Sequence, residues 1–550
     1  MKPDPKHRNL FNGDGNFIFQ DNFFPPNVPE TPNPAMLMHN YVDRLADNGI
    51  DTFIICVGGQ MPCYPTKLKI GAPEYKRGDR EFFRGYFPPT NDTDFPPEKL
   101  EKRMDDLARV MDRCVDLADA GFNGVVEMIK GCRNRGISPW ASLRMNDGHG
   151  ANNWDHCGFM NCPVQANPKF RLSGKRINPK DGSEYGWQLC NYEHREVRDY
   201  YFSLIKEVIE DLGVDALEID WWRAPFCCET PASQKTTDMI TNWHAEIREV
   251  ARAHAKKTGK PFYLGIRAPA RFGFLKSIGL DIKEMARRDL IDFFSTGNFC
   301  QANWEIPYDT LRAELGENVA IYGCIDASPN WLNVGPNESI ASHRNMSFSA
   351  PLVRGNAASH LALGVDGIEQ FNFFAAGNDP ENEVKYYKVL QGLADLENLR
   401  GQPKQYALST TYGWYMFPVF EYGEQIPAIL EPEWRKAFRL SMCAEPTDKN
   451  LKLTIQVIVE KKGKLPELGV SFNGSWPNFE ATATTELLFP TKHYSLVPSG
   501  HIALNYTCDV NLIKEGWNEI ILYNENHNRA TPEQRAANSV YVASIELSVA

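Results

Sequence analysis

Two carboxylates, Glu218 and Asp220, lie in the stretch Gly213-Val-Asp-Ala-Leu-Glu-Ile-Asp-Trp-Trp-Arg223. They alternate with Leu217 and Ile219, which is the period of two that a β-strand imposes on its faces. An amphipathic helix precedes this strand and two tryptophans follow it, so neither face is expected to lie in plain solvent. Burying two carboxylates on one face costs free energy unless a network or a function retains them. The pattern therefore predicts the end of a catalytic strand.

Hydrolysis of a glycosidic bond needs two carboxyl groups, one that protonates the leaving oxygen and one that attacks the anomeric carbon or activates water. Asp220 is the first candidate because it ends its strand. Its partner must come from another strand, and we expect Asp326, which follows Tyr322-Gly-Cys-Ile325. Glu218 lies about 6–7 Å deeper at the rise of a strand, where it either orients Asp220 or forms a buried ion pair. Glu369 is the reserve carboxylate.

Other polar and aromatic residues occur at the ends of predicted strands and in the loops that follow them. Arginine and asparagine bind hydroxyls or anions, and tryptophan stacks on sugar faces. Three arginines exceed what a neutral sugar requires, and guanidinium groups match carboxylate or sulfate geometry. This suggests an acidic sugar, unless each arginine pairs with a carboxylate of the barrel. The candidate substrate-binding residues are Arg144, Asn146, Asp147, His149, Trp221, Trp222, Arg223, Arg267, Asn298, Glu369 and Asn372.

Strands and helices alternate about eight times over residues 1–400. Helical spacing of apolar residues is clearest at positions 197–208, directly before the Glu218 strand. Alternation of this kind predicts parallel strands joined by right-handed crossovers. Eight such units over this length fit a (β/α)₈ barrel better than an open sheet, because Phe11-Asn-Gly-Asp-Gly15 is a poor match to a phosphate-binding loop. The active site of such a barrel lies at the carboxyl ends of its strands.

The pattern changes after residue 400. Residues 451–459, 469–473, 501–508, 517–523 and 540–549 resemble strands joined by turns. We expect residues 401–550 to form an all-β sandwich domain. Its segment Gly469-Val-Ser-Phe-Asn-Gly-Ser475 resembles the jelly-roll accessory domains of carbohydrate enzymes, although a purely structural role is an equal alternative.

Composition excludes several classes of protein. The chain has 550 residues, 42% of them hydrophobic and 23% charged, which is ordinary for a folded protein. A formal net charge of −11 argues against nucleic acid as the main partner. No apolar run approaches the ~20 residues that span a bilayer. Thirteen dispersed cysteines indicate reduced thiols. The N-terminus has no apolar signal core, so we expect cytoplasmic residence, or a periplasmic or secreted location if a signal was removed.

No cofactor or metal is expected. Asp147, His149, Asp155, His156 and Cys157 invite a zinc site, but their spacing matches no compact pattern. A histidine satisfied within its loop is the preferred interpretation. The chain also has no serine nucleophile elbow and no phosphate-binding loop.

The run Val197–Val208 followed by the Glu218/Asp220 strand resembles bacterial glycosyl-hydrolase-like barrel families. Arg144-Met-Asn-Asp-x-His and Gly364-Val-Asp-Gly-Ile-x-x-Phe-Asn resemble the same families at strands three and eight. The similarity covers about residues 9–400 and implies a (β/α)₈ glycosidase with an acid at the end of strand four. A glutamate typical of strand seven in these families is Asp326 here.

The leading hypothesis is a glycoside hydrolase that acts on a poly- or oligosaccharide. An acidic-polysaccharide lyase is the second enzyme class, in which the arginines and Tyr322 would serve beside a uronate. A sugar-binding barrel without catalysis is the alternative outside enzymes.

Overall fold

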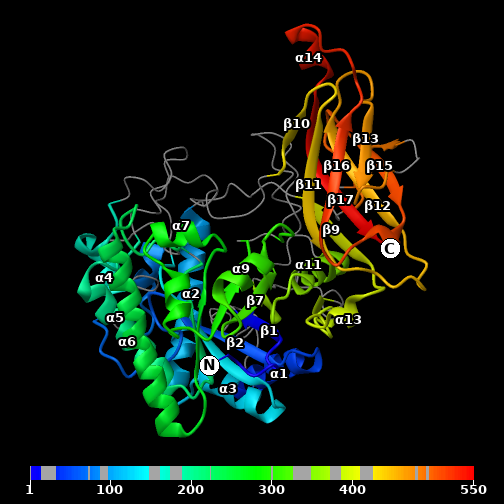
Figure 1. Ribbon diagram of the computed structural model, residues 1–550. Helices are drawn as coiled ribbons and strands as arrows, with labels where there is room; N and C mark the ends of the chain where they lie inside the picture. The colour runs from blue at the N-terminus through cyan, green and yellow to red at the C-terminus, as the bar shows by residue number, and fades with distance from the viewer. Residues whose placement is uncertain are drawn as a thin grey trace. The chain divides into compact units, whose positions relative to one another are not determined.

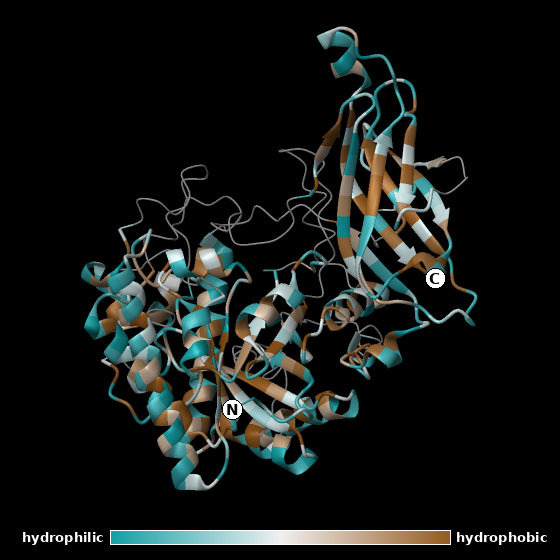
Figure 2. Cartoon of the chain, in the orientation of Figure 1, coloured by the Kyte–Doolittle hydropathy of each residue, from teal (hydrophilic) through white to brown (hydrophobic). Residues whose placement is uncertain are grey.

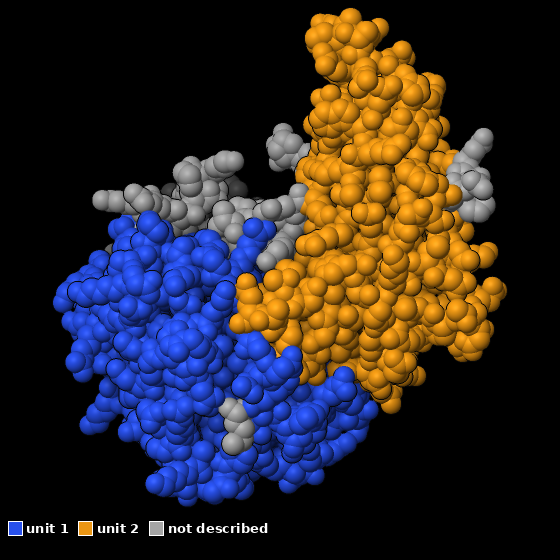
Figure 3. Space-filling model, viewed as in Figure 1, with its two compact units in different colours: residues 1–295, 315–320, 415–417 blue, residues 296–314, 321–414, 418–550 orange. Residues whose placement is uncertain are grey.

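The computed structural model describes residues 2–13, 33–71, 75–86, 97–147, 162–173, 189–222, 224–298, 302–325, 349–371, 386–408, 425–476, 481–490 and 495–550. The chain divides into two compact units (Figure 3). The first comprises residues 1–295, 315–320 and 415–417, and the second comprises residues 296–314, 321–414 and 418–550. The expected domain boundary after residue 400 stays a prediction.

Eight parallel strands close into a barrel in chain order, which confirms the predicted (β/α)₈ fold (Figure 1). Each strand is buried along almost its whole length, as expected for a parallel sheet that helices cover. The strands are β1 (Asn9–Gly13), β2 (Thr52–Gly58), β3 (Ser138–Arg144), β4 (Ala216–Asp220), β5 (Tyr263–Arg267), β6 (Phe293–Thr296), β7 (Ala320–Ile325) and β8 (Gly367–Phe371).

Helices follow the strands, and local sequence signals set their ends. Asn123 accepts hydrogen bonds from two backbone N–H groups at the start of the third helix, and Gly136 ends that helix at a φ of 70°. The helices of the barrel region are α1 (Pro34–Asp47), α2 (Pro97–Asp119), α3 (Gly124–Arg135), α4 (Pro163–Ala166), α5 (Arg195–Asp211), α6 (Gln234–Thr258), α7 (Phe272–Ser277), α8 (Ile282–Arg287), α9 (Tyr308–Leu315), α11 (Ala350–Ala362) and α13 (Leu396–Leu399).

The closing helix is not continuous. The apolar spacing predicts one helix over residues 386–399, but only a short helical turn at residues 386–388 and α13 are helical there. Gly392 adopts a φ of 69°, which a right-handed helix cannot continue through. The side chain of Asp395 then caps α13 by accepting a hydrogen bond from the Glu397 N–H. The expectation of a single closing helix was therefore wrong.

The β-rich part of the second unit contains two antiparallel sheets, as predicted for a sandwich. One sheet has the order β10-β17-β12-β15-β14, with β9 paired to β17, and the other has the order β11-β16-β13. Apolar and polar residues alternate along these strands in Figure 2. The strands are β9 (Lys404–Leu408), β10 (Ala428–Leu430), β11 (Arg435–Met442), β12 (Leu453–Glu460), β13 (Leu468–Phe472), β14 (Thr482–Thr484), β15 (His501–Cys508), β16 (Gly516–Asn524) and β17 (Val540–Val549).

Among the helices that the structure describes, none is both long and apolar enough to cross a membrane.

Three buried histidines make the stability of the fold depend on pH. Burial lowers the pKa of His7 and His360 to about 4 and that of His244 to about 3. Between pH 6.5 and about 4 the unfolded chain therefore binds more protons than the folded chain, and stability falls as the pH falls. Each histidine contributes a slope of up to about 1.4 kcal/mol per pH unit in this window.

We expect the thermal unfolding midpoint to fall between pH 7 and pH 5. We expect a smaller fall of this midpoint for the His244→Leu variant, because the substitution removes a titrating ring. It breaks no hydrogen bond, since no described residue bonds to either ring nitrogen of His244. His254→Gln, at a partly exposed position of α6, is the control and should keep the slope of the parent chain. An equal slope for His244→Leu and the parent chain would contradict the assignment of this histidine.

Candidate active site

The side chains that point into the barrel are identified by a contact between strands that are not neighbours. The Asn12 Nδ2 atom on β1 donates to the Glu218 Oε1 atom on β4 over 3.0 Å. Since β2 and β3 separate these strands in the sheet, both side chains must project into the interior. The register of β3 to β5 pairs Ser142 with Glu218, and it pairs Arg144 with Asp220 and Asp220 with Arg267. The barrel interior therefore holds Glu218 in one layer and Asp220 in the next layer toward the carboxyl ends of the strands.

Aromatic rings fill the layer at the amino-terminal ends. The ring of Trp140 lies 5.2 Å from that of His7, 6.2 Å from that of Tyr263 and 4.8 Å from that of Phe293. Gly265 leaves the space for Phe293, because a Cβ atom at residue 265 would lie 2.1 Å from its ring. This plug closes the bottom of the barrel, so any substrate must approach from the carboxyl ends of the strands.

Glu218 occupies the middle layer. Its Oε1 atom accepts hydrogen bonds from the Ser142 hydroxyl over 2.8 Å and from the Asn12 amide over 3.0 Å. The residue is completely buried. Sequence inspection proposed Glu218 but missed both of its partners. The signal was available, because Ser142 and Asn12 are polar residues at positions of otherwise buried strands.

Asp220 lies in the outer layer and is held by three hydrogen bonds. The Arg267 Nη1 atom donates to both of its carboxylate oxygens over 3.1 Å, and the backbone N–H of Trp222 donates to Oδ1 over 2.8 Å. Asp220 and Arg267 are each only 1% exposed. Charge-assisted bonds from a guanidinium and a hydrogen bond from a backbone N–H fix the orientation of the Asp220 carboxylate at the carboxyl end of β4.

A second buried ion pair lies in the same layer. Arg144, which is paired with Asp220 in the register, donates from Nη1 to the Asp147 carboxylate over 3.1 Å. Gly59 in the loop after β2 packs against this pair, since a Cβ atom there would lie 3.4 Å from the Cβ atoms of both residues. Two of the three predicted anion-binding arginines, Arg144 and Arg267, thus have carboxylate partners.

Ser295 extends this layer onto β6, where the register pairs it with Arg267. Its hydroxyl is completely buried and has no hydrogen-bond partner within the described part of the chain. A buried hydroxyl without a partner costs free energy until a water or a ligand satisfies it. Ser295 is therefore a polar group of the barrel interior at the carboxyl end of β6.

Asn146 holds two loops together. Its Nδ2 atom donates to the carbonyl oxygens of Cys190 and Phe226, over 3.1 and 2.7 Å, and its Oδ1 atom accepts from the Cys190 N–H over 2.9 Å. These contacts occupy the donors and acceptor of the amide, so the structure gives Asn146 the task of positioning the loops that follow β3 and β4.

The two tryptophans after β4 do not offer an open stacking surface. Trp221 is 0% exposed and meets the ring of Tyr192 edge-on at 4.8 Å, near the ring of His244 on α6. Trp222 is 1% exposed. The Trp221 ring faces the helical layer because Trp221 continues the alternation of Leu217 and Ile219, on the side opposite to Glu218 and Asp220. Neither tryptophan therefore exposes a ring face on which a sugar could stack.

Several predicted residues are not among the described residues of the first unit. Asn298 and Glu369 belong to the second unit, where Glu369 is completely buried and pairs in register with Cys324 of β7. The remaining predicted residues lie outside the described part of the chain, and they are His149, Arg223, Asp326 and Asn372.

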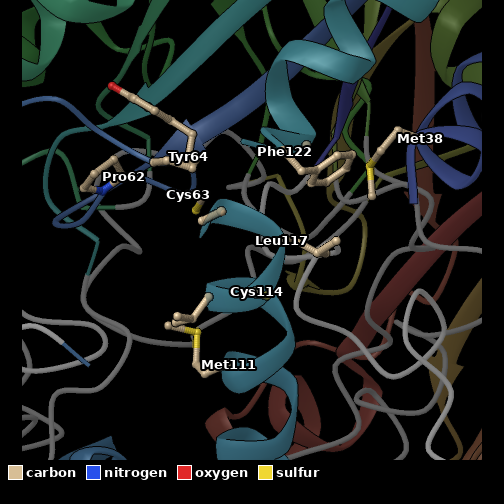
Figure 4. Close-up of a pocket in the computed structure, with 12 residues that line it drawn as sticks. Met38, Pro62, Cys63, Tyr64, Met111, Cys114, Leu117 and Phe122 are labelled. Carbon is tan, nitrogen blue, oxygen red and sulfur yellow. The ribbon is translucent and has the colours of Figure 1, made fainter. Parts of the chain in front are cut away.

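No group of three or more histidine, cysteine, aspartate or glutamate side chains that could hold a metal ion occurs among the described residues. A separate cavity of about 230 Å³ lies in the first unit among α1, α2 and the loop after β2 (Figure 4). Its walls are mostly apolar, with the thiols of Cys63 and Cys114 and the ring of Tyr64, whose hydroxyl donates to Glu207. The labelled lining residues are Met38, Pro62, Cys63, Tyr64, Met111, Cys114, Leu117 and Phe122.

No family model and no curated protein match the sequence. Among solved structures, the chain is similar to an α-amylase from Anoxybacillus, at 11% identity and a TM-score of 0.36 over 95% of this chain and 99% of that one. It is also similar to an α-amylase from Geobacillus thermoleovorans complexed with acarbose, at 11% identity and a TM-score of 0.36 over 96% and 100% of the two chains.

A cycloisomaltooligosaccharide glucanotransferase from Paenibacillus is similar at 9% identity and a TM-score of 0.31. The match covers 99% of this chain and 57% of the glucanotransferase, so the chain spans little more than half of that protein. At these TM-scores the similarity assigns neither a family nor a substrate to the chain.

Proposed function

We propose that the barrel hydrolyses glycosidic bonds and that Asp220 is the anionic carboxylate of the reaction. The observation that carries the proposal is the layer formed by Arg144, Asp220, Arg267 and Ser295 at the carboxyl ends of β3 to β6. Active sites of (β/α)₈ enzymes lie at this end. A carboxylate held in place there by a guanidinium and a backbone N–H is preorganised to face the positive charge that develops at an anomeric carbon.

Asp220 serves as the nucleophile, or as the base that activates water. The acid is assigned to another strand, because both carboxylate oxygens of Asp220 already accept hydrogen bonds within the barrel. Asp326, the residue after β7, is the first choice, and Glu369 on β8 is the reserve. Glu218 lies in the layer below Asp220, where Asn12 and Ser142 hold its carboxylate.

The pairing of the arginines bears on the substrate. An acidic sugar was suggested by three arginines, but Arg144 and Arg267 are neutralised by Asp147 and Asp220. With Glu218 also present, the described side chains of the barrel interior supply no excess of positive charge. A neutral glycan is therefore the preferred substrate class, and uronic or sulfated units would depend on Arg223.

One observation favours a different function. Asp220 and Arg267 are both almost fully buried, as expected of an ion pair that stabilises the barrel without taking part in a reaction. A sugar-binding barrel without catalysis is therefore the second candidate. A lyase is supported less, because the arginines that would neutralise a uronate already have carboxylate partners.

Release of reducing ends from neutral, uronic and sulfated glycans distinguishes these functions. We expect turnover on at least one neutral glycan, and no ultraviolet absorbance from an unsaturated uronic acid. Product absorbance on polygalacturonate would support the lyase. Binding to a glycan without release of reducing ends would support the non-catalytic barrel and overturn the proposal.

A further inference from the structure

The outer face of the β11-β16-β13 sheet carries an exposed cluster of aromatic and charged side chains. Alternation along β16 buries Ile520, Leu522 and Asn524 and turns Tyr523 outward. The register places Tyr523 between Arg435 of β11 and Gly469 of β13. These three residues therefore form one row across the sheet, on the face opposite its core.

Trp476 returns to this row through a tight turn. Asn473 and Gly474 adopt φ values of 51° and 83°, and Phe472 and Ser475 exchange backbone hydrogen bonds across the turn. The chain reverses, so that the Trp476 ring approaches Gly469. A Cβ atom at residue 469 would lie 3.5 Å from Cζ3 of Trp476 and 2.7 Å from Oε1 of Glu525. Gly469 has no side chain to fill the space between the Trp476 ring and the Glu525 carboxylate, so its backbone forms the floor of this space.

Arg435 is held by the two rings. Its Cζ atom lies 4.9 Å from the centre of the Tyr523 ring and 6.0 Å from that of Trp476. A guanidinium that rests on aromatic faces keeps its N–H groups directed outward, in the plane of the group. Within the described part of the chain, neither Arg435 nor Glu525 forms an ion pair or a side-chain hydrogen bond. A donor and an acceptor therefore flank the glycine floor without being paired to each other.

We propose that this cluster, formed by Arg435, Gly469, Trp476, Tyr523 and Glu525, binds a pyranose unit of a neutral glycan. Trp476 is 45% exposed and offers a flat apolar surface to the C–H face of a sugar ring. Arg435 donates to sugar hydroxyls and Glu525 accepts from them. The two charges cancel, which matches an uncharged polyol better than an anionic or cationic partner.

Ser471 lies on the same face of β13 as Gly469, since their neighbours Val470 and Phe472 turn into the core. It is only 1% exposed, so it belongs to the packing beneath the cluster and not to the surface that a ligand would contact. The site is independent of the barrel layer that holds Asp220, so it goes beyond the proposed hydrolysis.

Native affinity electrophoresis of the full chain tests the proposal. The probes are dextran, pullulan, a soluble β-1,3-glucan and xyloglucan, with polygalacturonate as the anionic probe. We expect at least one neutral glycan to retard the chain and Trp476→Ala to raise its dissociation constant about tenfold or more. Gly469→Val should also weaken binding, because its side chain fills the floor.

Trp434→Ala is the matched control, since Trp434 is similarly exposed at 52% and does not belong to the cluster. It should bind like the parent chain. Three results would overturn the proposal: no retardation by any neutral glycan, retardation by polygalacturonate alone, or equal losses in Trp434→Ala and Trp476→Ala. Self-association that Trp476→Ala abolishes, without glycan binding, would instead assign the face to a second copy of the chain.

Discussion

Turnover by the Asp220→Asn variant is expected to be about a thousandfold lower than that of the parent chain, or lower still. Asparagine keeps the shape of the side chain, and its Oδ1 atom can still accept hydrogen bonds from Arg267 and from the Trp222 N–H. It lacks the negative charge that faces the anomeric carbon in the transition state. The loss should therefore appear in kcat, measured as release of reducing ends from the glycan that the parent chain cleaves.

Two further variants separate a catalytic role from a structural one. Asp220→Gly with added azide should regain turnover and form a glycosyl azide if Asp220 is a nucleophile, because the small anion can occupy the vacated space. Asp215→Asn is the matched control, since Asp215 lies one residue before β4 and pairs with Arg133 outside the barrel interior. It should keep the kcat of the parent chain. Near-parental kcat in Asp220→Asn would show that the assignment of this carboxylate is wrong.

Replacement of Arg267 should strongly lower the free energy of unfolding. The Arg267→Met variant leaves the Asp220 carboxylate buried without its guanidinium, and we expect the free energy of unfolding to fall by about 3–5 kcal/mol. Arg267→Lys keeps the positive charge but not the planar guanidinium, so its loss should be smaller, about 1–2 kcal/mol. Urea denaturation followed by tryptophan fluorescence measures both variants, since Trp221 and Trp222 adjoin the pair in sequence.

The double variant Asp220→Asn/Arg267→Met completes the cycle. If the two side chains form one buried pair, the double variant loses much less stability than the sum of the single variants, because no uncompensated charge remains. Additive losses would contradict the pairing. The cycle also bears on function, since a purely structural pair predicts that kcat follows stability through all three variants.

The sequence was informative about single strands of the β-rich part. β15 and β17 were predicted at their observed bounds, because apolar runs and turn residues mark such strands locally. β11 was missed, although Arg435, Ala437 and Arg439 alternate on its exposed face. Arg435, Lys436 and Arg439 lower the mean hydropathy of the segment, and the period of two is then easily overlooked.

The sequence by itself determined that Glu218 and Asp220 share one face of a buried strand, because a period of two is a property of the local chain. Only the tertiary structure decided which groups they meet. Arg267 lies 47 residues from Asp220, and Asn12 lies 206 residues from Glu218. Contacts between residues so far apart in the sequence depend on the register between strands and on the closure of the barrel, which no local pattern encodes. For the same reason the burial of Trp221 and the role of Asn146 in joining two loops became visible only in the folded chain.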